Sequence, residues 1–188
     1  MPNGSSESTP RVTPPFGLRE AIRDCLPDVD QDVAVLHLSL LHLGRIVESS
    51  IQPLLVPDGL EISEHSVLSA LWFAGPPHTM SPTQLSQVIL QTTSGMSKTL
   101  RRIEGLGLIE RVANPADGRA RLVVLTEQGR DLAEHHLRQL VDQWGDGLKG
   151  LGTDEVRDIT NAVWSLVAQM DPTFKISAGE SSASISSP

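Results

Sequence analysis

The segment from residue 81 to residue 105 constrains the fold most, because it predicts two short helices joined by a tight turn. Ser81 begins a Ser-Pro-Thr-Gln motif, in which Ser81 and Gln84 can satisfy each other's free backbone amides as a capping box. Proline in the second position of this motif suits the first turn of a helix. A polar Gln-Thr-Thr break follows at 91–93, and glycines at 105 and 107 should end the second helix.

A β-hairpin is expected directly after the second helix. Leu108–Val112 and Arg119–Leu125 have the composition of strands, and the Asn-Pro-Ala-Asp-Gly segment between them is typical of a turn. Asp117 lies two residues before Arg119, so its carboxylate could orient the guanidinium through a bidentate pair. The hairpin would then present an arginine of fixed orientation beside the helix pair.

Further helices are predicted on both sides of this segment. Apolar residues recur at three- and four-residue steps over about 32–56, and a second apolar set occupies another face of the same helix. Ser63 should cap a short helix before the helix pair, and Thr126 and Thr153 should cap two helices after the hairpin. The expected fold is mainly α with a small β-hairpin. A helix that is apolar on two faces needs partners on both, which a second copy of the chain would supply.

The chain of 188 residues is long enough to bury one good core. Residues 1–17 are rich in proline and residues 175–188 are rich in serine, so we expect disordered tails around one domain at 18–174. No apolar run has the length of a membrane span, and the N-terminus lacks a signal-peptide pattern. A cytoplasmic protein without a membrane partner is therefore expected.

The charge is distributed unevenly along the chain. The net charge is −8, which argues against a generally basic nucleic-acid surface. Six of the fifteen basic residues nevertheless lie between residues 81 and 125, against three acids, so this segment carries +3 and the remainder −11. Such an asymmetry predicts a local cationic patch that could bind phosphate.

The helix at 93–105 places apolar residues on one face and hydroxyl groups and cations on the other. Such a face suits the major groove of DNA, although an isolated helix with this pattern is more often only solvated. The hairpin that follows favours the DNA hypothesis, because Arg119 could enter the adjacent minor groove. The predicted DNA contacts are Thr92, Thr93, Ser94, Ser97, Lys98, Arg101 and Arg102 on the helix, and Asp117, Arg119 and Arg121 on the hairpin.

These motifs resemble the multiple-antibiotic-resistance regulator (MarR) family of bacterial winged-helix proteins. The resemblance rests on residues 97–100, on Leu-Gly-Leu-Ile-Glu-Arg at 106–111, and above all on 117–129. In the last run, Asp-Gly-Arg leads into a strand that ends in Leu-Thr-Glu-Gln-Gly, as in the family's wing. The resemblance implies a winged helix-turn-helix domain in which Asp117 and Arg119 belong to the wing.

The resemblance also implies how the chain is organised. The DNA-binding part would span about 63–126, and dimerisation helices would span about 32–56 and 127–171. Members of the family are homodimers that bind pseudo-palindromic operators in double-stranded DNA. Two reading helices separated by one DNA turn would require such a repeated site.

A small-molecule effector is implied by the same resemblance. Many relatives release DNA when a small, often aromatic or phenolic, anion binds between the dimerisation helices and the winged region, so the chain is expected to be a repressor with such an effector. An ordinary core or surface role is the alternative for each residue that could line such a cavity. The candidates are His37, His42, Arg45, His65 and Trp72.

Other classes of protein have little support in the sequence. There is no Gly-x-Ser-x-Gly, His-Glu-x-x-His or phosphate-loop motif, so we expect no enzyme and no cofactor. His135 and His136 point about 100° apart on a helix, and His37 and His42 are five residues apart, so no metal site is expected. Two alternatives stay open: a winged-helix module that binds only protein, and a redox-sensing regulator that uses the single cysteine, Cys25. The redox alternative is weakened because the peroxide-sensing relatives use tyrosine partners, and this chain has no tyrosine.

Overall fold

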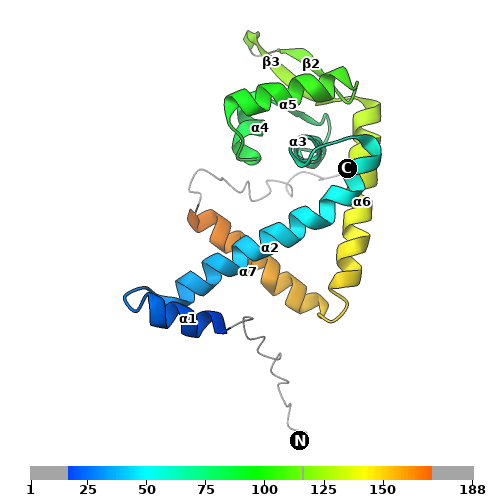
Figure 1. The fold of residues 1–188 in the computed structure, drawn as a ribbon. Coiled ribbons are helices and arrows are strands. Elements are labelled where there is room, and N and C mark those ends of the chain that lie inside the picture. The colour runs from blue at the N-terminus through cyan, green and yellow to red at the C-terminus, as the bar shows by residue number, and fades with distance from the viewer. Residues whose placement is uncertain (1–16, 116, 171–188) are drawn as a thin grey trace, which may run out of the picture. The chain divides into compact units, whose positions relative to one another are not determined.

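The computed structural model describes residues 17–115 and 117–170 (Figure 1). The chain divides at Pro53 into two compact units, each of which is described by itself. The described residues are mainly helical with a small three-stranded antiparallel sheet, which confirms the predicted fold class. The predicted tails at 1–17 and 175–188 lie outside the described residues, except for Gly17.

The first unit consists of α1 (Leu18–Cys25) and nearly all of α2 (Gln31–Leu55). The sequence predicted α2 within one residue at each end and did not predict α1. Asp30 caps α2, because its carboxylate accepts hydrogen bonds from two free amides of the first turn, at 2.9 and 3.1 Å. Pro53 lies in the last turn, and the helix ends two residues after it.

The second unit contains the helix pair and the hairpin. Its helices are η2 (Val56–Asp58), α3 (Ile62–Phe73), α4 (Pro82–Val88), α5 (Thr93–Gly105), α6 (Glu127–Gly147) and α7 (Thr153–Met170). Its strands are β1 (Thr79–Met80), β2 (Ile109–Asn114) and β3 (Asp117–Leu125). Of the helices that the structure describes, none combines the length and the apolar character that a membrane span requires.

The predicted caps of α4 and α6 are confirmed. Ser81 accepts a hydrogen bond from the amide of Gln84 at 3.2 Å, and the Gln84 side chain accepts one from the amide of Ser81 at 2.8 Å. Thr126 accepts one from the amide of Gly129 at 3.0 Å. The starts of α4 and α6 are therefore set by local signals that the sequence carries.

Two predicted caps are wrong. The N-cap of α3 is Glu61 rather than Ser63, and the amide of Glu61 donates to the Glu64 carboxylate at 2.9 Å. Glu64 is the third residue of the helix and can reach back to the cap, whereas Ser63 has only a serine three residues later. Thr153 is the first residue of α7 rather than its cap, so the helix begins one residue earlier than a cap at Thr153 would require.

The hairpin of β2 and β3 pairs in register from Ile109 opposite Leu125 to Ala113 opposite Arg121, with an irregularity after Ala113. Both strands extend two residues farther into the predicted turn than the sequence indicated. The two-residue strand β1, which was not predicted, pairs with the other edge of β3, which gives the strand order β1–β3–β2. The hairpin and α5 lie side by side in Figure 1.

The core of the second unit lies between α3, the helix pair and the sheet. Its fully buried apolar side chains include Val67, Leu68, Leu71, Leu85, Met96, Leu100, Ile103 and Val123. Gly129 packs against the start of the hairpin so closely that a Cβ atom there would lie 1.9 Å from the carbonyl oxygen of Leu108. Thr126 reinforces this junction by donating from its hydroxyl to the carbonyl of Gly107 at 2.7 Å. The Thr-x-x-Gly end of the wing motif therefore joins the hairpin to α6.

Candidate nucleic-acid interface

Helix α5 is held by one face and exposes the other. Met96, Thr99, Leu100 and Ile103 are buried beneath it, and Thr99 is also hydrogen-bonded to the Gln91 side chain at 3.2 Å. Each helix residue that the sequence selected for DNA contact is exposed: Thr92, Thr93, Ser94, Ser97, Lys98, Arg101 and Arg102. The exposed face is therefore the one that the sequence pattern indicated.

The N-terminal end of α5 carries hydroxyl groups above the turn between α4 and α5. Thr92 caps the helix by accepting from the amide of Gly95 at 3.2 Å, and Ser97 donates to the carbonyl of Thr93 at 2.9 Å. A groove of about 290 Å³ runs beside this end between α4 and α5. Free amides at a helix N-terminus favour phosphate, so this end suits the DNA backbone as well as base edges.

The cations of the predicted patch differ in whether they are paired. Lys98, Arg101 and Arg121 are exposed and form no ion pair with any described residue. Arg111 donates from Nε to the Glu104 carboxylate at 3.0 Å and so ties β2 to α5. The side chains of these three residues can therefore bind phosphate, whereas Arg111 joins β2 to α5.

Arg102 is also engaged within the protein. Its guanidinium donates to the Glu64 carboxylate, which is 2% exposed, and to the carbonyl oxygen of Gly59 at 2.6 Å. The hydrogen bond to Glu64, followed by the attraction of that carboxylate, raises the pKa of Arg102 above its usual value. Arg101 and Arg102 are neighbours in sequence, but only Arg102 is bound within the protein, and its predicted contact with DNA stays a prediction.

Some parts of the wing, which is the hairpin of β2 and β3, lie outside the described residues. Asp117 is exposed at the start of β3, and Arg121 is exposed farther along the same strand. Arg119 belongs to β3, but its side chain lies outside the described residues. The proposed pairing of Asp117 with Arg119 therefore stays a prediction.

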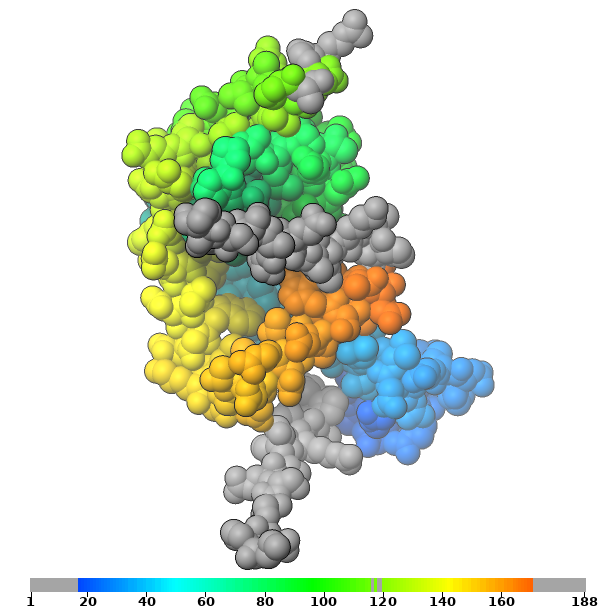
Figure 2. All heavy atoms as spheres, turned by 180° about the vertical axis from the view of Figure 1, so that it is seen from behind, coloured from blue at the N-terminus to red at the C-terminus, as the bar shows by residue number. Residues whose placement is uncertain are grey.

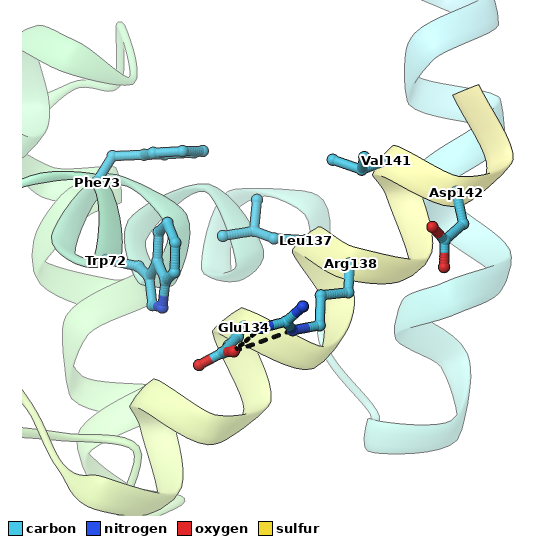
Figure 3. A pocket seen from close by; sticks show the side chains of 7 residues that line it. All are labelled: Trp72, Phe73, Glu134, Leu137, Arg138, Val141 and Asp142. Atoms are coloured by element: carbon cyan, nitrogen blue, oxygen red, sulfur yellow. Dashed lines mark hydrogen bonds and ion pairs between the residues drawn. The ribbon is translucent and has the colours of Figure 1, made fainter. Parts of the chain in front are cut away.

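A pocket of about 460 Å³ lies between the C-terminal end of α3 and the middle of α6 (Figure 3). Trp72 and Phe73 form one wall, with ring centroids 5.3 Å apart and an edge-to-face arrangement. Leu137 and Val141 of α6 face them across the pocket. The remaining lining residues are Glu134, Arg138 and Asp142. Of the five predicted effector residues, Trp72 is the one that lines this pocket.

His65 lies elsewhere, in a buried polar cluster. Its ring is 5.6 Å from that of His136, which bonds Asp58 through Nε2 at 2.8 Å. The Nδ1 atoms of both histidines are buried and have no partner among the described residues. Burial, and then the charge of His136, lowers the pKa of His65 to about 4. His65 is therefore neutral at neutral pH.

The remaining predicted positions lie on the first unit. His37, His42 and Arg45 are exposed on α2, and their role toward an effector stays a prediction. Cys25 is exposed at the end of α1. Within residues 17–115 and 117–170, no three His, Cys, Asp or Glu side chains are arranged to hold a metal ion.

The helix pair, the hairpin that follows it and the exposed face of α5 define a winged helix-turn-helix protein. The sequence pattern of the MarR family matches residues 58–120. The multiple antibiotic resistance protein MarR of Salmonella typhimurium is 29% identical over 125 residues, which cover 62% of this chain and 85% of that protein. The transcriptional regulator PecS of Dickeya dadantii is 22% identical over 129 residues, covering 69% of this chain and 78% of the relative.

The solved structures that share the fold include MarR and a MarR-family regulator, as the sequence relatives do. The reduced form of MarR from E. coli is 27% identical, with a TM-score of 0.56 over 68% of this chain and 93% of that one. AbsC, a MarR-family transcriptional regulator of Streptomyces coelicolor, shares the fold with a TM-score of 0.64 at 19% identity, over 76% and 96% of the two chains. Together these findings confirm the resemblance that the wing motif indicated: residues 58–120 match the MarR family, and MarR-family regulators are among the relatives and the solved structures that the chain is similar to.

Proposed function

We propose that the chain is a homodimeric repressor that reads a pseudo-palindromic operator and releases it when a small aromatic molecule binds. The proposed DNA binding rests on the exposed face of α5, where hydroxyl groups and unpaired cations lie beside the hairpin. A face of this kind matches the donors and cations that major-groove recognition uses.

The contacts with DNA divide by chemistry. Thr93, Ser94, Ser97 and Lys98 at the N-terminal end of α5 would lie nearest the base edges, since recognition helices enter the groove by that end. Arg101 and Arg121 would contact phosphates, because both are exposed cations without an internal partner. Arg119 would enter the minor groove from the wing.

Homodimer formation is supported by apolar side chains that the described chain leaves exposed. On α2 these include Val33, Leu36, Leu38, Leu41, Leu43 and Ile46. On α7, which lies at the surface in Figure 2, they are Ile159, Val163, Trp164 and Met170. A continuous apolar helix face is typical of an interface with another chain.

The pocket between α3 and α6 is the proposed effector site. Two structures that share the fold were solved with aromatic ligands: NadR with 4-hydroxyphenylacetate, and CouR of Rhodococcus jostii with p-coumaroyl-CoA. In this chain Trp72 and Phe73 supply aromatic surface, and Arg138 is already bound to Glu134 at 2.5 and 2.9 Å. With Asp142 also present, the polar groups favour a phenolic hydroxyl donor over a free carboxylate.

A mobility-shift assay tests the proposed DNA binding. The purified protein should retard the DNA that flanks its own gene at concentrations that leave a random duplex of the same length free. Equal affinity for the two duplexes would contradict sequence-specific binding.

A thermal-shift screen tests the proposed effector site. Uncharged phenols should raise the melting temperature more than benzoate does, with about 2.7 kcal/mol of stabilisation at a hundred times Kd. Trp72→Ala should abolish the shift. A shift that survives in Trp72→Ala would place the ligand elsewhere.

A further inference from the structure

Glu64 is a buried carboxylate with two functions. It lies in the first turn of α3 with 2% of its side chain exposed, and its Oε2 accepts from the amide of Glu61 at 2.9 Å. The same oxygen accepts from the guanidinium of Arg102 on α5. A buried carboxylate is costly unless it is both paired and hydrogen-bonded, and here one oxygen achieves both. The recognition helix is therefore fastened to the cap of α3.

Arg102 reaches a second acceptor on a different segment. Its other terminal nitrogen donates to the carbonyl oxygen of Gly59 at 2.6 Å. Gly59 has φ +63, a left-handed conformation that suits glycine, and its amide closes the η2 turn on Val56 at 3.1 Å. A planar guanidinium can join two acceptors in fixed directions, which a lysine ammonium does less well.

The residue before Gly59 connects the same turn to α6. Asp58 Oδ2 lies 2.8 Å from Nε2 of His136, whose side chain is 1% exposed. The turn is thus bonded to α5 through Gly59 and to α6 through Asp58. These contacts place α3, α5 and α6 around one short turn.

We propose that Arg102 is a positioning residue, which sets the orientation of the recognition helix through Glu64 and Gly59 and does not itself contact DNA. The inference rests on the proposed DNA-binding function. It separates two neighbouring arginines: Arg101 would contact DNA, and Arg102 would fix the angle at which Ser97 and Lys98 meet the bases. Loss of the Arg102 contacts should therefore weaken specific binding more than non-specific binding.

The test compares lysine substitutions at the two neighbouring positions. The probes are a duplex that the wild-type protein selects from a random library and a random duplex of equal length. Arg101→Lys alters a phosphate contact that both duplexes share, so it should change both affinities by the same factor and leave the ratio of selected to random affinity near the wild-type value. Arg102→Lys keeps the charge and loses the two-acceptor geometry, so its ratio should fall by about tenfold or more. A partly unfolded variant lowers both affinities equally, so the ratio is insensitive to stability alone.

Glu64→Gln supplies an independent test. Removal of a negative charge near the DNA surface should tighten binding if only the overall electrostatic attraction matters. The positioning proposal predicts the opposite for the selected duplex, because Arg102 loses its anchor. A wild-type affinity ratio in Arg102→Lys, or a tighter selected complex in Glu64→Gln, would overturn the inference. If the wild-type protein selects no sequence at all, the proposed function fails instead.

Discussion

The two ends of α5, the proposed recognition helix, differ in the contacts that hold them. At the N-terminal end, Lys98 and the hydroxyl-bearing residues are exposed, and the cation has no internal partner. At the C-terminal end, Arg102 is bound to Glu64 and Gly59, and Glu104 is bound to Arg111. A helix that reads DNA needs a free end to make contacts and a fixed end to hold the angle. Both ends of α5 carry charged residues in the sequence. In the structure, the charged residues at the C-terminal end are paired within the protein, whereas Lys98 at the N-terminal end is not.

The largest loss of stability near the C-terminal end of α5 is expected from a substitution at Gly129 of α6. At the end of α5, the amide of Leu108 donates to the carbonyl of Ile103 at 3.0 Å. Gly129 packs against the carbonyl oxygen of Leu108. A Cβ at position 129 would lie 1.9 Å from that oxygen, so Gly129→Ala should lower the free energy of unfolding by about 3 kcal/mol. Urea denaturation measures this change.

Gly145→Ala is the matched control on the same helix. A Cβ at that position meets nothing within 4 Å, so the substitution should stabilise the protein by about 1 kcal/mol through helix propensity. If both glycine substitutions change the stability by the same amount, the close packing of α6 on the hairpin does not hold.

Acid should weaken the support beneath the fixed end. His65 follows Glu64 on α3, and its folded pKa of about 4 lies below the ordinary value of 6.5. The unfolded state therefore binds more protons between these values, so stability falls as the pH falls from 6.5 and levels off below 4. The full loss should be about 3 kcal/mol. His65→Gln should remove this part of the pH dependence, as urea denaturation at several pH values would show.

The exposed His135 provides the comparison for that experiment. It lies on α6 beside His136, but its side chain is exposed, so His135→Gln should leave the pH dependence close to that of the wild type. A profile that is flat for the wild type below pH 6.5 would show that His65 takes up a proton in the folded protein without cost.

The free end should be more tolerant. Thr92 caps α5 through the amide of Gly95, so Thr92→Ala should cost about 1 kcal/mol of stability. Thr93 is exposed in the first turn and does not cap the helix, so Thr93→Ala should change stability by less than about 0.5 kcal/mol. Thermal unfolding of the two variants distinguishes a helix held by its cap from one held by packing alone.

The sequence predicts the local parts of this structure well. The caps of Ser81 and Thr126, the limits of α5 and the wing motif all depend on residues within a few positions of each other. Local hydrogen bonds and turn preferences determine these features, so periodicity and spacing identify them. Every α5 residue selected for DNA contact from the helical pattern proved to be exposed.

The sequence pattern did not predict contacts between residues that are far apart in the chain. Nothing in the spacing indicates that Arg102 would meet Glu64, 38 residues away, or that His136 would meet Asp58, 78 residues away. Phe73, Leu137 and Val141 carry only an apolar signal, which does not distinguish a pocket wall from a core face. The strand β1 has two residues and is formed by pairing with β3, so its sequence alone gives no strand signal.

The salt dependence of binding to the selected duplex tests the contrast between the two ends most directly. Lys98→Ala removes an unpaired cation from the DNA surface, so it should lower the slope of log affinity against log salt by about 0.9, the value for one cation fewer. Arg102→Ala should weaken the complex and leave the slope at the wild-type value. An unchanged slope in Lys98→Ala, or a slope lowered by the same amount in Arg102→Ala, would contradict the division of α5 into a free reading end and a fixed end.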